Sequence, residues 1–398
     1  MKRIKSDFIG TSVLVGFAII VVVVTIAYFS QKENLASRDS RNEVSVESVD
    51  SASRAGEQKT RTPDQKPTER TRPTVVTPPV TPTTPSPTPK PTPAPANSVS
   101  PVLAPSGVRL ISSTSCGVST CYTLGVTCEG ITEKQIILQT TSPESPKGAV
   151  VLGTGGHSNV LYSRQSTEQS QTVKTLVDNN FEVFELYWKN GWPSAADDAG
   201  FRKAMCGYAQ AVQWIASSKA KQPQTMCAQG NSAGSFSIGY GLSSYGLENI
   251  LDMVILSGGP PTSRLDVSCF GSTDPALKGA VWSLDIAGRQ IVDVAMGWSR
   301  TGSYCKKGGP SSEDRVKALQ DTSLVSPTET RDYSFPKTKV NFVNSNTDYA
   351  NATGKLYHDV ITTAKAWYQI SGDEHGVDQT TDGAKKIRDL FLTECVAQ

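Results

Sequence analysis

Histidine is scarce in this chain, which has only His157, His358 and His375 among its 398 residues. Three scattered histidines cannot assemble a His-rich cluster, and the cysteine spacings do not match zinc knuckles, so no metal or cofactor is expected. Charge is nearly balanced, with 39 basic and 37 acidic residues and a formal net charge of +2. This balance predicts neither nucleic-acid binding nor an acidic substrate.

Charged residues are missing from the stretch Phe8–Phe29, which follows Lys2, Arg3 and Lys5. About 20 apolar residues cross a bilayer as a helix. The stretch lacks the short core and small-residue end of a cleavable signal, so we expect residues 1–30 to hold an uncleaved anchor; a cleaved signal and a secreted protein are the alternative. Because the basic residues come first, the N-terminus is expected in the cytoplasm and the rest outside the cell.

Signs of a packed core are missing from residues 31–105. Fourteen of the chain's 24 prolines fall between Pro63 and Pro105. Such a segment cannot bury enough apolar surface to offset its ordering entropy, and it favours extended polyproline II. We expect a disordered stalk that carries a globular domain, residues 106–398.

Cysteine is absent from the anchor and the stalk. All eight cysteines lie beyond them, at Cys116, Cys121, Cys128, Cys206, Cys227, Cys269, Cys305 and Cys395. An even number outside the cytoplasm indicates disulfides, and buried free thiols in a reducing compartment are the alternative. We expect the pairs Cys206–Cys227 and Cys269–Cys305. The first three cysteines are close enough in sequence to exchange partners, so their pairing stays open.

Strand-like and helix-like segments alternate through the globular domain. Strands are expected at 122–127, 134–139, 149–152, 181–187, 225–228, 251–256, 340–343 and 366–370. Helices are expected at 167–179, 201–217, directly after Ser232, at 354–364 and from about residue 383. The first two strands are expected to be antiparallel. The alternation after them predicts a mostly parallel sheet with helices on both faces, and ligands bind beyond the carboxyl ends of such strands.

The pentapeptide Gly230-Asn231-Ser232-Ala233-Gly234 lies between the apolar strand 225–228 and a helix-like segment. G-x-S-x-G between a strand and a helix is the pattern of a nucleophile elbow, a turn so sharp that glycine must flank the serine. The turn exposes the Ser232 hydroxyl. The alternative is a glycine-rich loop with no catalytic role.

A serine nucleophile needs a base, usually histidine, oriented by a carboxylate. His375 follows the last expected strand, whereas His358 falls inside an expected helix, where packing or surface exposure is its ordinary role. Asp348 follows the preceding strand and is the favoured acid. Asp332 and Asp359 are weaker rivals, one before a strand and the other within a helix.

The tetrahedral intermediate of acyl transfer needs two N–H donors. Ala233 offers one through its backbone. The second is expected from the loop that follows the strand 149–152, at Gly156 or its neighbour His157. A tight turn without a ligand is the alternative interpretation of the glycines there.

The order Ser232, Asp348, His375, with a glycine-rich loop after an upstream strand, resembles the α/β-hydrolase superfamily over about residues 134–395. The resemblance implies an eight-stranded, mostly parallel sheet and acyl transfer through a serine ester. It maps the nucleophile to Ser232, the base to His375, the acid to Asp348, and the oxyanion donors to Ala233 and to Gly156 or His157. The chain departs from the HGGG pattern of many lipases and esterases, having Gly-Thr-Gly-Gly instead.

Residues 258–335 form an insertion between two strands that is longer than an ordinary crossover. It contains an expected helix at 276–296. In this superfamily such a position commonly holds a lid, and additional core packing is the alternative.

These observations predict a membrane-anchored extracellular serine hydrolase, similar to carboxylesterases and lipases, that cleaves carboxylic esters of unknown type. Two alternatives remain. One is a catalytically silent α/β-hydrolase that serves as a surface binding module. The other is a serine peptidase of the same fold.

Overall fold

The computed structural model describes residues 107–221, 225–280, 284, 286–307, 312–372 and 374–396. The expected anchor and stalk, residues 1–105, lie outside this part of the chain. Among the described residues, no helix combines the length and the apolar character needed to cross a bilayer.

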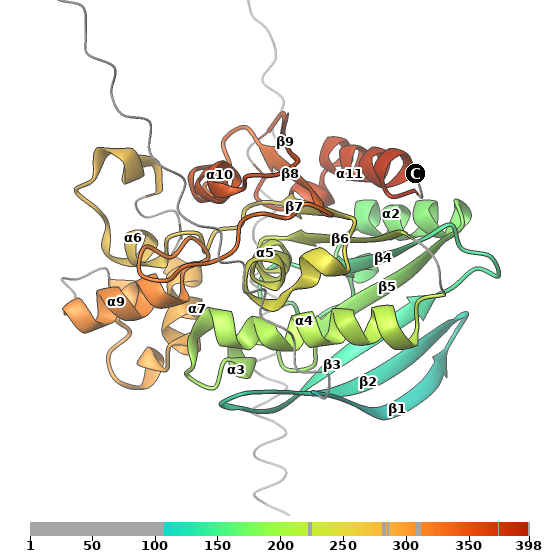
Figure 1. Ribbon diagram of the computed structural model, residues 1–398, viewed down its shortest axis with the longest axis horizontal. Helices are drawn as coiled ribbons and strands as arrows, with labels where there is room; N and C mark the ends of the chain where they lie inside the picture. Colours follow the sequence, from blue (N-terminus) through green and yellow to red (C-terminus); the bar gives the residue numbers. More distant parts are fainter. Residues whose placement is uncertain are drawn as a thin grey trace, which may run out of the picture. The chain divides into compact units, whose positions relative to one another are not determined.

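One sheet of nine strands, in the order β1-β2-β3-β5-β4-β6-β7-β8-β9, forms the centre of the described domain (Figure 1). Its strands are β1 (Val108–Cys116), β2 (Ser119–Cys128), β3 (Ile131–Thr141), β4 (Gly148–Gly153), β5 (Phe181–Trp188), β6 (Thr225–Asn231), β7 (Met253–Ser257), β8 (Lys339–Ser345) and β9 (Lys365–Ile370). β1, β2, β3 and β5 pair antiparallel in turn, and the pairs from β5 through β9 are parallel. This is the mostly parallel sheet of the α/β-hydrolase fold with one strand added at its edge.

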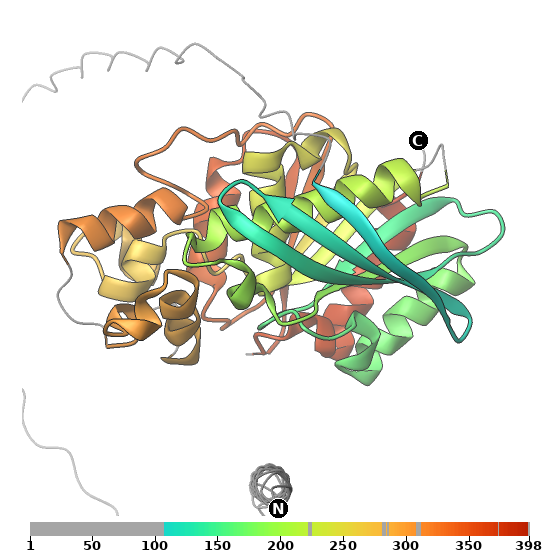
Figure 2. The same cartoon turned by 90° about the horizontal axis from the view of Figure 1, so that it is seen from below.

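The added strand corrects the expected count of eight. The eight expected strands correspond to β2 through β9, and β1 was missed because its sequence, VRLISSTSC, has no apolar alternation and most of its side chains are exposed. It is held by backbone pairing along β2, from Val108 opposite Val126 to Cys116 opposite Ser119. Figure 2 shows the antiparallel strands side by side with α4 (Gly200–Ser218) along them.

Helices cover both faces of the sheet, as expected. The main ones are α2 (Thr167–Asp178), α4, α5 (Ala233–Tyr245), α10 (Asn351–Val360) and α11 (Thr381–Glu394). One apolar cluster joins the sheet to α4, α5 and α10, and a second joins its other face to α2 and α11. α4 places Ala204, Tyr208, Ala211 and Ile215, which share one helical face, in the first cluster.

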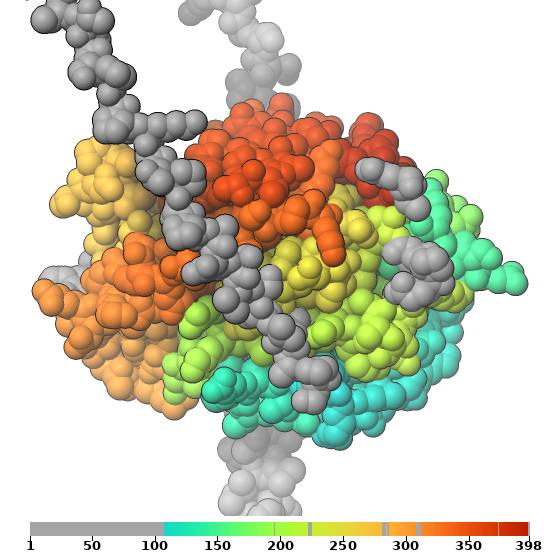
Figure 3. All heavy atoms as spheres, in the orientation of Figure 1, coloured from blue at the N-terminus to red at the C-terminus, as the bar shows by residue number. Residues whose placement is uncertain are grey.

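The helices of the insertion between β7 and β8 lie together at one end of the sheet (Figures 1 and 3, yellow to orange). It comprises α6 (Leu265–Phe270), η3 (Pro275–Ala280), α7 (Ile286–Ala295), η4 (Trp298–Arg300), α8 (Tyr304–Lys307) and α9 (Glu313–Thr322). The single helix expected at 276–296 is wrong, because a 3₁₀ segment and a separate α-helix occupy this stretch. Gly279 is a poor helix former and packs closely on α10, where an added Cβ would lie 3.2 Å from that of Ala352.

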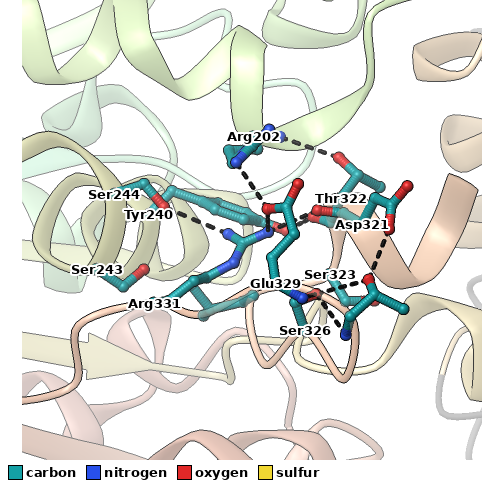
Figure 4. A network of polar contacts seen from close by, with 12 residues as sticks. Arg202, Tyr240, Ser243, Ser244, Asp321, Thr322, Ser323, Ser326, Glu329 and Arg331 are labelled. Atoms are coloured by element: carbon teal, nitrogen blue, oxygen red, sulfur yellow. Dashed lines mark hydrogen bonds and ion pairs between the residues drawn. The ribbon is translucent and has the colours of Figure 1, made fainter. Parts of the chain in front are cut away.

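A polar network ties the end of the insertion to α4 and α5 (Figure 4). The buried Arg331 guanidinium donates to the Asp321 carbonyl at 2.7 Å and to Glu329 at 3.3 Å. It also donates to Ser244 on α5, at 3.3 Å. Glu329 also accepts a hydrogen bond from the Arg202 guanidinium of α4, at 2.7 Å. One carboxylate therefore bonds two guanidinium groups from different parts of the chain, which ties the end of the insertion to α4.

All eight cysteines are paired. The disulfides are Cys116–Cys121, Cys128–Cys206, Cys227–Cys395 and Cys269–Cys305. The expected pair Cys269–Cys305 is confirmed, and the pair Cys206–Cys227 is wrong. Cys206 lies on α4 against one face of the sheet, whereas Cys227 belongs to the apolar cluster on the other face, where α11 brings Cys395 to it.

Removing Cys227–Cys395 should destabilise the fold more than removing Cys116–Cys121. Their sequence separations are 168 and 5 residues. In the chain-entropy model, cross-links of these spans contribute about 5 and about 2 kcal/mol. Denaturant unfolding of the two double Cys→Ala variants measures the difference, and equal losses would contradict the prediction.

Candidate active site

Ser232 stands between β6 and α5 with φ 51° and ψ −103°, a backbone conformation that L-residues rarely adopt. A Cβ on Gly230 would lie 2.3 Å from the carbonyl carbon of Gly234, so glycine is required there. A Cβ on Gly234 would lie 3.0 Å from the carbonyl oxygen of Gly153 in β4. The strained strand–turn–helix geometry expected of a nucleophile elbow is thus present.

His375 and Asp348 meet although 27 residues separate them in sequence. Asp348 lies in the loop after β8 and His375 in the loop after β9, so the adjacent parallel strands deliver both to one edge of the sheet. His375 Nδ1 lies 2.9 Å from Asp348 Oδ1. The fully buried carboxylate also accepts from the Ala350 backbone N–H at 2.8 Å. Since a carboxylate only accepts, Nδ1 carries the proton and Nε2 is left as a potential base.

Ser232 and His375 line the same cavity, whose volume is about 770 Å³. Within the described part of the chain, His375 Nε2 has no hydrogen-bond partner, and no hydrogen bond joins it to the Ser232 hydroxyl. Such catalytic contacts are often long without substrate and tighten when it binds. The Tyr349 ring, its centroid 4.3 Å from that of His375, covers the imidazole at an angle of 30°.

The loop after β4 presents backbone groups to this cavity, which Gly156 and His157 line. The Gly156 carbonyl accepts from the Trp192 indole at 2.8 Å, and the His157 carbonyl accepts from the Trp192 backbone at 3.0 Å. Among the described residues, neither the Gly156 nor the His157 N–H donates a hydrogen bond. Ala233 opens α5, whose first N–H groups have no intrahelical acceptor. The predicted oxyanion residues therefore lie around one cavity together with Ser232.

The rival residues lie elsewhere. His358, on α10, packs between the rings of Phe342 and Trp367, with centroids 5.3 and 5.6 Å away, and is not among the cavity's lining residues. Burial lowers the pKa of His358 despite the nearby Asp359. Asp332 accepts from a backbone N–H two residues on, as expected of a turn residue.

The walls of the cavity were identified only in part by sequence. Its apolar wall is made by Trp192, Phe201, Phe236, Leu284, Ile291 and Val292. Its polar wall includes Asn159, Gln165, Glu374, Gln379 and Thr380. Trp192 opens α3 (Trp192–Ala195), which follows β5. The contribution of α7 depends on how the insertion folds, which no local pattern reveals.

Asp378, in η5 (Val377–Gln379), was missed altogether. It is completely buried, and its Oδ2 accepts from the side-chain amides of Gln169 at 2.9 Å and Gln229 at 3.3 Å. Burial raises the pKa of Asp378 to about 6, although the two amides and the charge of His375 oppose the shift. Nothing in the sequence His-Gly-Val-Asp-Gln distinguishes this carboxylate from a surface turn residue.

The raised pKa of Asp378 predicts a pH-dependent stability. Between the ordinary value of 3.8 and about 6, the folded protein binds this proton more tightly than the unfolded chain. The group's contribution to stability is therefore fully present below about pH 4 and is lost as the pH rises through 6, a change of about 3 kcal/mol. The unfolding free energy of Asp378→Asn, minus that of the wild type, should rise by this order from pH 4 to pH 7. A difference that does not vary with pH would contradict the prediction.

Comparisons with known proteins find structural similarity only. No protein-family model matches the chain, and no curated protein matches it by sequence. Acetyl xylan esterase 1 from Thermoanaerobacterium sp. JW/SL YS485 is 15% identical, with a TM-score of 0.46 over 73% of this chain and 88% of that one. An esterase from Pyrobaculum calidifontis is 16% identical, with a TM-score of 0.45 over 70% of this chain and 86% of that one.

A dienelactone hydrolase from Anabaena variabilis ATCC 29413 is 11% identical, with a TM-score of 0.40 over 71% of this chain and all (100%) of that one. Structural similarity at these sequence identities and TM-scores does not bear on the chemistry of this chain. The sheet order and the geometry around Ser232 are what define it as an α/β-hydrolase fold with a candidate active site.

Proposed function

We propose that this chain is a serine hydrolase that cleaves carboxylic esters with Ser232 as nucleophile, His375 as base and Asp348 as the orienting acid. One observation carries the proposal. A strained elbow serine and a histidine whose Nδ1 is bound to a buried carboxylate line the same cavity, and the histidine Nε2 makes no hydrogen bond to the residues that the structure describes. This is the arrangement that serine acyl transfer requires.

Acylation uses these groups in sequence. The Ser232 oxygen bonds to the ester carbonyl carbon while His375 Nε2 takes the hydroxyl proton. The resulting oxyanion accepts from the Ala233 N–H and from the N–H of Gly156 or His157. The bond to the alcohol oxygen then breaks, and His375 returns the proton to the leaving alcohol. The buried Asp348 stabilises the imidazolium throughout and remains ionised.

Deacylation repeats these steps with water. His375 takes a proton from a water molecule as its oxygen bonds to the acyl carbon. The tetrahedral intermediate uses the same N–H donors. Collapse of the intermediate releases the carboxylic acid, and the proton returns to the Ser232 oxygen. Metal or cofactor chemistry has no part in this proposal.

The cavity supports an ester with a sizeable apolar group. Its volume of about 770 Å³ lies within the range of small-molecule sites, and aromatic and aliphatic side chains form one wall. Four residues of α7 line it: Ala287, Gly288, Ile291 and Val292. We therefore keep the interpretation of the insertion, residues 258–335, as a lid that shapes the substrate pocket.

The proposed location rests on residues outside the described part of the chain. We propose that residues 1–30 anchor the protein as a single-pass segment and that residues 31–105 act as an extended stalk, with the catalytic domain outside the cell. Four disulfides within the described domain fit an oxidising compartment. Protease accessibility of the domain on intact cells tests this placement.

Hydrolysis of p-nitrophenyl esters of graded acyl length, compared with peptide p-nitroanilides, tests the proposed activity. Ester turnover that depends on Ser232 supports the esterase, and its length profile measures the pocket. Faster cleavage of the anilides would favour a serine peptidase of the same fold. No turnover by a folded protein that also fails to react with a fluorophosphonate would favour the silent binding module.

A further inference from the structure

A buried polar cluster lies beneath the loop that carries His375. Asp378 follows the histidine by three residues and is completely buried. Its Oδ2 accepts hydrogen bonds from the side-chain amides of Gln169 on α2 and Gln229 on β6. Gln229 lies three residues before Ser232. One carboxylate oxygen therefore joins the segment bearing the base to the strand that delivers the nucleophile.

The same segment has a second anchor on its other side. The Ser345 hydroxyl, at the end of β8, donates to the Glu374 carbonyl at 2.8 Å. His375 thus lies between two fixed points, one before it on the β8 side and one after it on the β6 side. The Asp348 contact at 2.9 Å restrains the ring itself, but it does not hold the backbone of the loop against β6.

We propose that Asp378 is a positioning residue for the hydrolysis proposed above: its bonds to Gln229 and Gln169 hold the His375 loop against β6 so that Nε2 reaches the Ser232 hydroxyl. The inference depends on that proposed function. A misplacement of about 1 Å between reacting groups can lower a rate about 100-fold, so a loop anchor of this kind has a measurable consequence.

Packing alone does not account for a carboxylate at this position. Its Oδ1 has no hydrogen-bond partner among the described residues, and neither has the Gln229 side-chain oxygen. The buried Tyr162 hydroxyl nearby makes no hydrogen bond to Asp378. Unpartnered buried polar atoms cost stability, and an apolar side chain of similar size would avoid that cost. A buried carboxylate that lowers the stability of the fold and lies beside a candidate base is expected where the reaction needs it.

The structure offers a variant that removes the anchor and preserves the packing. Asp378→Leu deletes both acceptor bonds and fills the same space. Each glutamine amide keeps one of its two hydrogen bonds, to Ser257 for Gln229 at 3.0 Å and to Gln165 for Gln169 at 3.1 Å, and loses the one to Asp378. Asp378→Asn is the conservative rescue, because its amide oxygen can accept both bonds.

The experiment measures kcat and KM for a p-nitrophenyl ester, and thermal unfolding, on the full chain. Asp378→Leu should lower kcat about 10- to 100-fold with KM within about threefold, in a protein that still unfolds cooperatively above the assay temperature. Asp378→Asn should stay within about threefold of the wild type. Tyr162→Phe, which removes a hydroxyl of the same cluster that makes no bond to Asp378, is the matched control and should leave both constants unchanged.

A wild-type kcat in Asp378→Leu would overturn the inference, and so would an equal loss in Asp378→Asn, because the amide keeps the anchor. Should the leucine variant not fold, Gln229→Met removes the donor on β6 and should lower kcat about 10-fold. Failure of the inference is distinguishable from failure of the function. In the first case the wild type shows Ser232-dependent turnover and the Asp378→Leu variant matches it, and in the second the wild type shows none.

Discussion

Replacing Ser232 with alanine should lower kcat for ester hydrolysis by about 10⁴-fold or more and leave the fold unchanged. The change removes the atom that, in the proposed mechanism, bonds to the substrate carbonyl carbon. Within the described part of the chain the Ser232 hydroxyl makes no hydrogen bond to His375 Nε2, so its loss does not unpair that nitrogen. The melting temperature should therefore match that of the wild type. Initial rates with p-nitrophenyl esters, beside thermal unfolding, measure both effects.

The matched control for this prediction is Ser243→Ala. Ser243 lies on the same helix, is buried, and donates to the Gly239 carbonyl, at 2.9 Å. It is absent from the cavity wall, so kcat should remain within about threefold. Substantial turnover by the Ser232→Ala protein would assign the reaction to another nucleophile.

Replacing His375 with alanine should have an effect of the same order, because the serine would lose the base that takes its proton. His358→Ala should be nearly silent in kcat, since this side chain packs on Phe342 and Trp367 away from the cavity. It should instead lower stability by about 1 to 2 kcal/mol through lost packing. Kinetics and denaturant unfolding of both variants separate the two roles. Equal losses of kcat would show that the base is misassigned.

The candidate site was largely predictable because its signals are local. Glycine at 230 and 234 is required by contacts within the turn itself, where a side chain would meet backbone at 2.3 and 3.0 Å. The scarcity of histidine left few candidates for the base, and only His375 follows a strand. Asp348 follows the neighbouring strand, so the parallel sheet was enough to predict that the two would meet.

What was missed depends on partners that are distant in sequence. β1 is polar and is held by backbone pairing, so no apolar periodicity marks it. Cys227 pairs across 168 residues, because α11 packs on that face of the sheet. Asp378 is buried by α2 and β6, and its sequence neighbours give no sign of either contact.

The central claim is that Ser232 is a nucleophile activated by His375. The most direct measurement is to incubate the protein with a fluorophosphonate and map the adduct by peptide mass spectrometry. We predict a single adduct on Ser232, formed rapidly by the wild type and by His358→Ala but not by His375→Ala. No adduct on a folded protein, an adduct on another residue, or equally fast labelling of His375→Ala would contradict the claim.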